Sequence, residues 1–224
     1  MLTRMELGRI AGIPIYLDMF FVLVLLLFTY PYFTSGNTQL MSAGFIIVAG
    51  LLLSILLHEL GHAFAGRLFN AHVSHIDLTG IGGVAHFERS LPASALARVV
   101  IYLAGPAVNL GLWYGLGALA GEAYQGSSPM VALPLAVLAS ANYILLIFNL
   151  LPAYPLDGGR TLDALLGAVL GGVWATRIVA TLGLVVAAGV AYYALPTNFF
   201  MLLIAFFLAQ ANWEALQSIG GWRR

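Results

Sequence analysis

The chain has 224 residues, of which 61% are hydrophobic and only 8% are charged, and nine basic residues balance nine acidic ones to a formal net charge of zero. Soluble domains carry about 25% charged residues, so this composition excludes the soluble classes and indicates an integral membrane protein. The zero net charge excludes a basic nucleic-acid-binding protein, and the absence of Cys excludes disulfides and thiolate metal sites.

Long apolar runs predict about six membrane spans within a single transmembrane domain that covers residues 1–224. In chain order, the predicted spans cover residues 16–33, 42–69, 93–120, 130–151, 174–195 and 199–216. Pro152 and Pro155 interrupt the chain after the fourth span, and a helix can restart at Asp157 as its N-cap and continue to residue 170. Residues 1–18 lack the short apolar core and the small-residue cleavage site of a signal peptide, and we expect the first apolar run to be retained.

Residues 71–89, between the second and third spans, have shorter apolar stretches divided by a Gly80–Gly83 turn. This pattern predicts strands or a β-hairpin lying against the protein. The expected fold class is therefore an all-α polytopic membrane protein with a small membrane-associated strand region. The segment also holds His72, His75 and His86, which can be plain polar groups or ligands of an inhibitory or second metal.

The basic residues, all of them Arg, predict the orientation of the chain in the membrane. With six spans, they all fall in segments that share one side, namely the N-terminus, the 2–3 and 4–5 connections and the C-terminus: Arg4, Arg9, Arg67, Arg89, Arg98, Arg160, Arg177, Arg223 and Arg224. The loops on the other side carry only Glu122. Because cytoplasmic loops are enriched in Arg and Lys, we expect both termini to be cytoplasmic.

His58, Glu59 and His62 form an HExxH motif inside the second span. Residues four apart lie on one face of a helix, so both imidazoles can bind one metal ion, with Glu59 beside them to act on a metal-bound water. Ionisable side chains in a membrane span are costly and usually functional. The alternative is that both His pack against polar groups inside the bundle. His62 lies about seven residues, or roughly 10 Å, before the end of the span, which favours a site near the cytoplasmic side.

A catalytic zinc has three protein ligands and one water, so two His leave the site incomplete. Asp157 is the best candidate for the third ligand, because Pro152 and Pro155 break the helix there and Gly158 and Gly159 let the backbone turn closely around a buried site. Its alternative role is that of a helix N-cap. The weaker candidates, which lie near span ends or in loops, are Asp18, Asp77 and Asp163.

Three segments resemble the site-2 protease family of intramembrane zinc metalloproteases. They are Leu57–Ala63 around the HExxH motif, Ala104–Asn109, which is similar to the family's GPxxN turn, and Asn149–Arg160, which matches its NxxP…LDG motif. Gly8–Ile15 and the Gly-rich stretch 76–88 are also similar to the family. The resemblance covers nearly the whole chain and is closest to the compact form of the family, without PDZ or CBS domains.

The resemblance implies one zinc ion per chain, held by His58, His62 and Asp157, with Glu59 as general base and acid. It also implies that Asn149 holds the substrate or polarises its carbonyl. The alternative for Asn149 is a helix–helix hydrogen bond, which is the role expected of Asn142.

The expected function is that of an intramembrane zinc metalloendopeptidase that cleaves a single-span membrane protein within or near its transmembrane segment. The expected location is the inner membrane of a prokaryote, with contacts to the lipid bilayer and to no nucleic acid. The strands at 73–87 can pair with an unwound substrate segment or form only a structural hairpin. For the whole protein, the alternatives are a metal-ion transporter that uses the same His and Asp site and an inactive scaffold.

Overall fold

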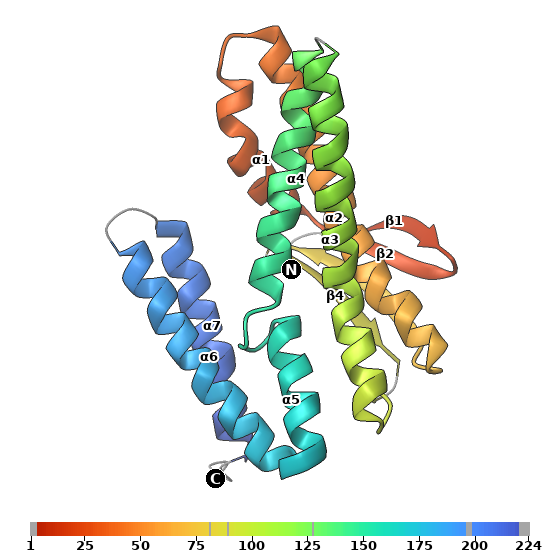
Figure 1. Cartoon of the computed structure of the whole chain (residues 1–224), viewed down its shortest axis with the longest axis vertical. Coiled ribbons are helices and arrows are strands. Elements are labelled where there is room, and N and C mark those ends of the chain that lie inside the picture. Colours follow the sequence, from red (N-terminus) through yellow and green to blue (C-terminus); the bar gives the residue numbers. More distant parts are fainter. Residues whose placement is uncertain (1–3, 81, 89, 127, 196–198, 220–224) are drawn as a thin grey trace. The chain divides into compact units, whose positions relative to one another are not determined.

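The computed structural model of the chain describes residues 4–80, 82–88, 90–126, 128–195 and 199–219. Four strands and seven helices follow one another along these residues (Figure 1). The strands are β1 (Arg4–Ile10), β2 (Ile13–Asp18), β3 (Val73–Thr79) and β4 (Gly82–Phe87). The helices are α1 (Met19–Phe33), α2 (Thr38–Leu68), α3 (Ala95–Gln125), α4 (Pro129–Asn149), α5 (Asp157–Leu170), α6 (Gly172–Ala194) and α7 (Phe199–Ile219).

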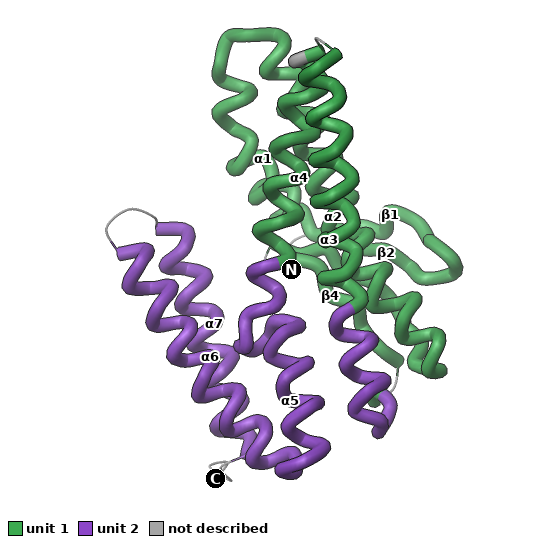
Figure 2. Tube along the Cα trace, in the orientation of Figure 1, with its two compact units in different colours: residues 1–91, 104–146 green, residues 92–103, 147–224 purple. Residues whose placement is uncertain are grey.

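The chain divides into two compact units, drawn in different colours in Figure 2. Unit 1 comprises Met1–Leu91 and Ala104–Leu146, and it holds the strands, α1, α2 and most of α3 and α4. Unit 2 comprises Pro92–Leu103 and Ile147–Arg224, and it holds α5, α6 and α7.

The strands of unit 1 form one mixed sheet in the order β1-β2-β3-β4. The pairs β1–β2 and β3–β4 are antiparallel, whereas β2 and β3 run parallel. The strands predicted within 71–89 are present as β3 and β4. The sequence interpretation was wrong in giving the N-terminal segment no strand and in starting the first span at residue 16, because β2 continues to Asp18. Its buried positions Ile13, Ile15 and Leu17 alternate with partly exposed ones, which is the period of a strand.

The core of unit 1 lies between this sheet and the first two helices. Its buried side chains come from β2, β3, α1 and α2: Ile13, Ile15, Leu17, Phe21, Leu25, Leu56, Leu60, Ala63, Val73, Ile76 and Leu78. Leu56, Leu60 and Ala63 lie on one face of α2, in the same turns as the HExxH motif. The core therefore fixes these turns of α2 against the sheet.

Helix α1 is shorter than the first predicted span. It begins after Asp18, whose carboxylate accepts a hydrogen bond from the backbone N–H of Phe20 at 2.9 Å, and it has 15 residues. At 1.5 Å per residue it is about 22 Å long, less than the roughly 30 Å of a bilayer's hydrocarbon core. Among the described residues, five helices are long and apolar enough to cross a membrane: α2, α3, residues 130–149 of α4, α6 and α7. The prediction of six spans is thus an approximation.

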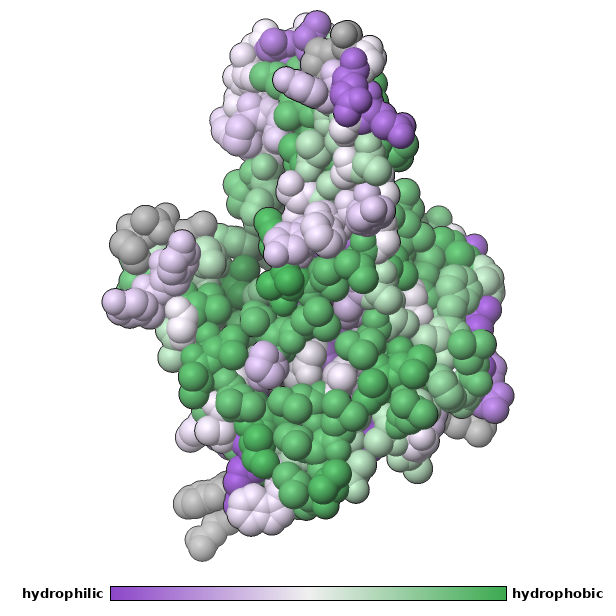
Figure 3. All heavy atoms as spheres, in the orientation of Figure 1, coloured by the Kyte–Doolittle hydropathy of each residue, from purple (hydrophilic) through white to green (hydrophobic). Residues whose placement is uncertain are grey.

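Hydrophobic residues cover most of the visible surface along the helices (Figure 3). They include large side chains that a soluble protein would bury, among them Leu27, Phe45, Val185 and Phe206. An apolar surface of this extent fits the hydrocarbon of a bilayer rather than water. The chain is an integral membrane protein.

In unit 2, α6 packs against both α5 and α7. The fully buried Asn212 of α7 accepts a hydrogen bond from the backbone N–H of Tyr154 at 3.0 Å and donates one to its carbonyl at 2.8 Å. A Cβ on Gly183 of α6 would overlap the Asn212 amide. Helix α7 thus holds the loop that precedes α5.

The orientation of the chain stays a prediction. Arg89, Arg223 and Arg224, which contribute to it, lie outside the described residues. The pairing of β2 with β3 joins the N-terminal segment to the connection after α2, and these are two of the segments predicted to share one side.

Candidate metal centre

The HExxH motif lies in the C-terminal part of α2, where core contacts hold the helix against the sheet. His58, Glu59 and His62 are buried, each with 6–7% of its surface exposed. As the four-residue spacing predicted, the two imidazoles lie on one face of the helix. Their ring centroids are 4.7 Å apart and their Nε2 atoms are 3.1 Å apart.

The separation of the two Nε2 atoms fits two ligands of one metal ion. Nitrogens bound to zinc at roughly 2.0–2.1 Å in a tetrahedral site lie about 3.3 Å from each other. Two lone pairs that face each other at 3.1 Å repel, so a proton or a metal ion is needed between them. Imidazole nitrogen is a donor that suits zinc.

A chain of hydrogen bonds determines which nitrogen of His58 carries the proton. Ser54 Oγ donates to the Gly50 carbonyl at 2.8 Å, so it accepts from Asn142 Nδ2 at 2.9 Å. Asn142 Oδ1 accepts from Asn109 Nδ2 at 2.8 Å. Asn109 Oδ1 therefore faces His58 Nδ1, and Nδ1 must be the protonated nitrogen that donates to it. This leaves the lone pair of His58 on Nε2, the nitrogen that faces His62.

Asn109 is the residue of the candidate site that the sequence interpretation missed. It is fully buried and hydrogen-bonds to Nδ1 of His58, the ring nitrogen that does not face the candidate metal position. The signal that could have found it is the GPxxN segment, which had been identified without a role for its Asn. The helix–helix role predicted for Asn142 is confirmed, because its amide joins α4 to both α2 and α3.

Two glycines bring the backbones of α2 and α3 together at the imidazoles. A Cβ on Gly61 would lie 2.8 Å from the carbonyl oxygen of Ala104. A Cβ on Gly105 would overlap Nε2 of His62 and lie 2.6 Å from Nε2 of His58. Gly105 therefore leaves a cradle over both nitrogens, in the place where a side chain would prevent an ion from binding.

The carboxylate of Glu59 lies next to β4, the edge strand of the sheet. A Cβ on Gly83 would lie 2.7 Å from Glu59 Oε1 and would overlap its Cγ. Glycine at this position lets the strand backbone lie directly on the carboxylate. The candidate general base is thus in contact with a strand edge as well as being adjacent to His58.

Asn149 and Asp157 belong to unit 2. Asn149 is the last residue of α4 and is partly exposed, and Asp157 is buried and is the first residue of α5. The predicted restart of the helix at Asp157 is confirmed, but the N-cap role was wrong. The cap position is occupied by Leu156, and no side chain makes a capping hydrogen bond there.

Gly158 and Gly159, which follow Asp157, lie against the backbone of the preceding loop. A Cβ on Gly158 would overlap the carbonyl of Leu150, and a Cβ on Gly159 would lie 2.5 Å from the carbonyl of Ala153. The close turn predicted for this segment is present within unit 2, because only glycine fits at either position.

The three weaker ligand candidates have structural partners. Asp18 caps α1, and Asp163 accepts a hydrogen bond from Thr176 Oγ1 at 3.0 Å. Asp77 lies on β3, with Oδ1 2.7 Å from Arg4 Nη2. Each of the three carboxylates therefore has a partner that does not belong to the HExxH motif.

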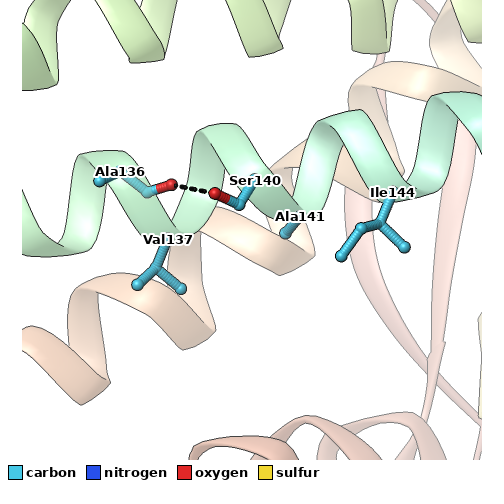
Figure 4. A pocket seen from close by; sticks show the side chains of 5 residues that line it. All are labelled: Ala136, Val137, Ser140, Ala141 and Ile144. Atoms are coloured by element: carbon cyan, nitrogen blue, oxygen red, sulfur yellow. Dashed lines mark hydrogen bonds between the residues drawn. The ribbon is translucent and has the colours of Figure 1, made fainter.

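A depression on the surface of α4 is lined by Ala136, Val137, Ser140, Ala141 and Ile144 (Figure 4). Its one polar side chain, Ser140, donates its hydroxyl to the carbonyl of Ala136 at 2.9 Å. A depression formed by one apolar helix, with no ionisable group in its lining, fits a lipid-facing groove and not a catalytic site.

Comparisons with known proteins identify the family. The model of peptidase family M50 matches residues 46–124 and 121–195. A zinc metalloprotease of Methanocaldococcus jannaschii is 31% identical over 206 residues, which cover 91% of this chain and 58% of the relative. Stage IV sporulation protein FB of Bacillus subtilis is 30% identical over 114 residues, which cover 50% of this chain and 37% of the relative. The chain spans about half the length of the curated relatives it matches.

The fold is similar to that of a solved member of the family. The site-2 protease from Methanocaldococcus jannaschii matches with a TM-score of 0.68 and 26% sequence identity, over 96% of this chain and 95% of that one. The family model, the curated relative and the solved structure agree with the three motifs in the sequence. The chain belongs to peptidase family M50, the site-2 protease family.

Proposed function

We propose that the protein is an intramembrane zinc endopeptidase that hydrolyses a peptide bond within or near the transmembrane segment of a single-span membrane protein. The observation that carries this proposal is the buried His58–His62 pair, with facing Nε2 atoms and with Glu59 beside it. The pair lies in a helix long and apolar enough to cross a membrane. Ionisable groups in such a helix are costly and are retained for function.

In this proposal, His58, His62 and Asp157 hold one zinc ion per chain. The two imidazoles bind the ion through their Nε2 atoms, in the space that the missing side chain of Gly105 leaves open. The position of Asp157 in the family's LDG motif and its burial at the start of α5 support it as the third ligand. When bound, zinc lowers the pKa of a coordinated water to about 7 and polarises the scissile carbonyl.

Glu59 acts as the general base and acid. Its carboxylate takes a proton from the attacking water and passes it to the leaving amine. Burial beside β4 keeps bulk water from the carboxylate, which strengthens its electrostatic interactions. Asn149 donates an amide hydrogen bond to the substrate carbonyl and stabilises the charge that develops on its oxygen.

The edge strand β4 holds the unwound substrate segment by pairing with it as an added strand. A substrate helix has its carbonyls in hydrogen bonds and must open before hydrolysis, and β4 offers an edge next to Glu59. Neighbouring N–H groups of a strand point to opposite sides, so one of Val84→Pro and Ala85→Pro removes an N–H from the free edge of β4 and the other removes one from its pairing with β3. We expect both to slow cleavage. Unchanged cleavage by both variants would exclude pairing at this edge.

The experiment that tests the proposed function is cleavage of a panel of single-span substrates by the wild type and by Glu59→Gln, with bound zinc measured on both. We expect both proteins to bind zinc and only the wild type to cleave. A metal-ion transporter with the same His and Asp ligands would tolerate the substitution as long as those ligands remain. The two function classes therefore give opposite results.

The proposed location is a prokaryotic inner membrane, with both termini and the active site toward the cytoplasm. The distribution of Arg among the connections supports this orientation. The sheet also supports this orientation, because the pairing of β2 with β3 joins the N-terminal segment to the connection after α2, and both segments carry Arg.

A further inference from the structure

The sheet carries a second group of metal-binding side chains, separate from the HExxH motif. His75 and Asp77 are two residues apart on β3, so they lie on the same face of the strand. His86 on β4 is the direct cross-strand partner of His75, and their imidazole rings stack with centroids 4.4 Å apart and planes at 12°. The register of the β3–β4 hairpin thus brings the three side chains together.

This group lies on the face of the sheet that points away from the core. Ile76, which lies between His75 and Asp77, is buried in the core, and Ala85 and Phe87 on either side of His86 pack against it. The side chains of His75, Asp77 and His86 are 27%, 18% and 45% exposed. An ion can therefore reach them without any opening of the fold.

The two distances between an imidazole nitrogen and the carboxylate oxygen fit ligands of one metal ion. The Nε2 atoms of His75 and His86 lie 3.4 and 3.2 Å from Oδ2 of Asp77, and one ligand atom from each of the three residues lies within 4.8 Å of the others. Ligands of a tetrahedral zinc ion are about 3.3 Å apart. Two imidazole nitrogens and one carboxylate oxygen also form a donor set that zinc accepts, with positions left for water.

Hydrogen bonds around Ser74 indicate where the proton of His75 lies. Ser74 Oγ donates its hydrogen to the carbonyl of His86 at 2.9 Å, so it accepts from His75 Nδ1, which is also 2.9 Å away. The Nε2 of a neutral His75 then carries a lone pair, and it faces a carboxylate oxygen of Asp77. Two acceptors face each other stably only with a proton or a metal ion between them.

Arg4 orients the carboxylate without occupying the oxygen that faces the imidazoles. Its Nη2 lies 2.7 Å from Oδ1 of Asp77, whereas both His face Oδ2. The guanidinium stacks 3.9 Å above the ring of Tyr16, which in turn makes an edge contact with His75. Asp77 can therefore bind an ion through Oδ2 while its other oxygen stays paired.

We propose that His75, Asp77 and His86 form a second site for a divalent transition metal, with zinc as the ion to test. Because its ligands come from both strands, a bound ion joins β4 to β3. Gly83 of β4 lies on Glu59, so the ion would stabilise the strand edge beside the proposed general base. The site does not depend on the proposed protease activity.

Zinc titration of the purified full-length protein tests this proposal. At saturating buffered Zn²⁺, we expect two equivalents on the wild type and one on His75→Ala/His86→Ala. Removing a residue that only hydrogen-bonds to a metal ligand lowers metal affinity about 10–100-fold. The loss of a His ligand itself should therefore lower the zinc affinity of the second site at least about 10-fold. His72→Ala is the matched control, because His72 is an exposed His just before β3 that is not part of the group. It should keep two equivalents.

The variant His58→Ala/His62→Ala separates the second site from the proposed active centre. It should retain one equivalent of zinc, and Zn²⁺ should slow amide hydrogen exchange at residues 82–87 in this background. Adding His86→Gln, at a half-exposed position, should remove both this zinc equivalent and the slowed exchange. It replaces His75→Ala/His86→Ala if that variant does not fold. The proposal is overturned if His58→Ala/His62→Ala binds no zinc, if the zinc content of the wild type is unchanged in His75→Ala/His86→Ala, or if His72→Ala loses as much zinc as that double variant.

Discussion

Gly105→Ala should weaken zinc binding at the HExxH site although it removes none of the candidate ligands. The new Cβ would lie 2.6 Å from Nε2 of His58 and would overlap Nε2 of His62. Non-bonded heavy atoms prefer separations of about 3.5–4.0 Å, so α3 or both imidazoles would have to move by about 1 Å. A displacement of about 1 Å at a catalytic centre can reduce activity about 100-fold. We expect substrate cleavage to fall by about that factor and zinc affinity at the HExxH site to fall about 10–100-fold, as it does when the orientation of a ligand is disturbed.

The matched control is Gly111→Ala on the same helix, because a Cβ at Gly111 would meet nothing within 4 Å. The assay is competition for zinc with a chromophoric chelator, together with cleavage of a single-span substrate, for both variants and the wild type in the same lipid. We expect Gly111→Ala to behave as the wild type. If Gly105→Ala binds zinc as tightly as the wild type, the ion does not bind in the space next to Gly105. Equal losses in the two variants would show a general effect on the helix instead.

Asn109→Ala removes the oxygen that holds the proton on His58 Nδ1, so zinc affinity should fall about 10–100-fold in the same competition assay. Asn109→Asp keeps an acceptor oxygen at that position and should lose less; equal affinity in Asn109→Ala and the wild type would contradict the role of the hydrogen-bond chain. Reporters fused at Gly36, at Gly126 and at Thr197, which lies outside the described residues, should report the outer side of the membrane, and a fusion at the C-terminus should report the cytoplasm. A cytoplasmic signal at any of the first three sites would exclude the predicted orientation.

The five long apolar helices and the His pair could be predicted from the sequence because their signals are local. The apolar run of α2 is one continuous segment, and the spacing of His58 and His62 alone places both imidazoles on one face of that helix. The glycines at 158 and 159 are equally local, since each lies against the backbone of the loop just before it.

The features that the sequence did not reveal depend on partners distant in the chain. The alternation of Ile13, Ile15 and Leu17 is visible in the sequence, but the partner of β2 is β3, about 60 residues further on. The role of Asn109 depends on α4 contributing Asn142 and α2 contributing Ser54 to one chain of hydrogen bonds. The cap position before α5 could not be predicted from residue type, because Leu156 occupies it without a side-chain hydrogen bond.

The most direct test of the central claim is the cleavage rate per bound zinc of Glu59→Gln compared with the wild type. The amide of Gln cannot take up the proton of the attacking water, while His58 and His62 keep their places. We predict the zinc content of the wild type and a rate lower by about 10²–10⁴-fold, the usual contribution of a general base. Full zinc with cleavage at the wild-type rate would contradict the claim that Glu59 performs the proton transfer of an intramembrane zinc protease.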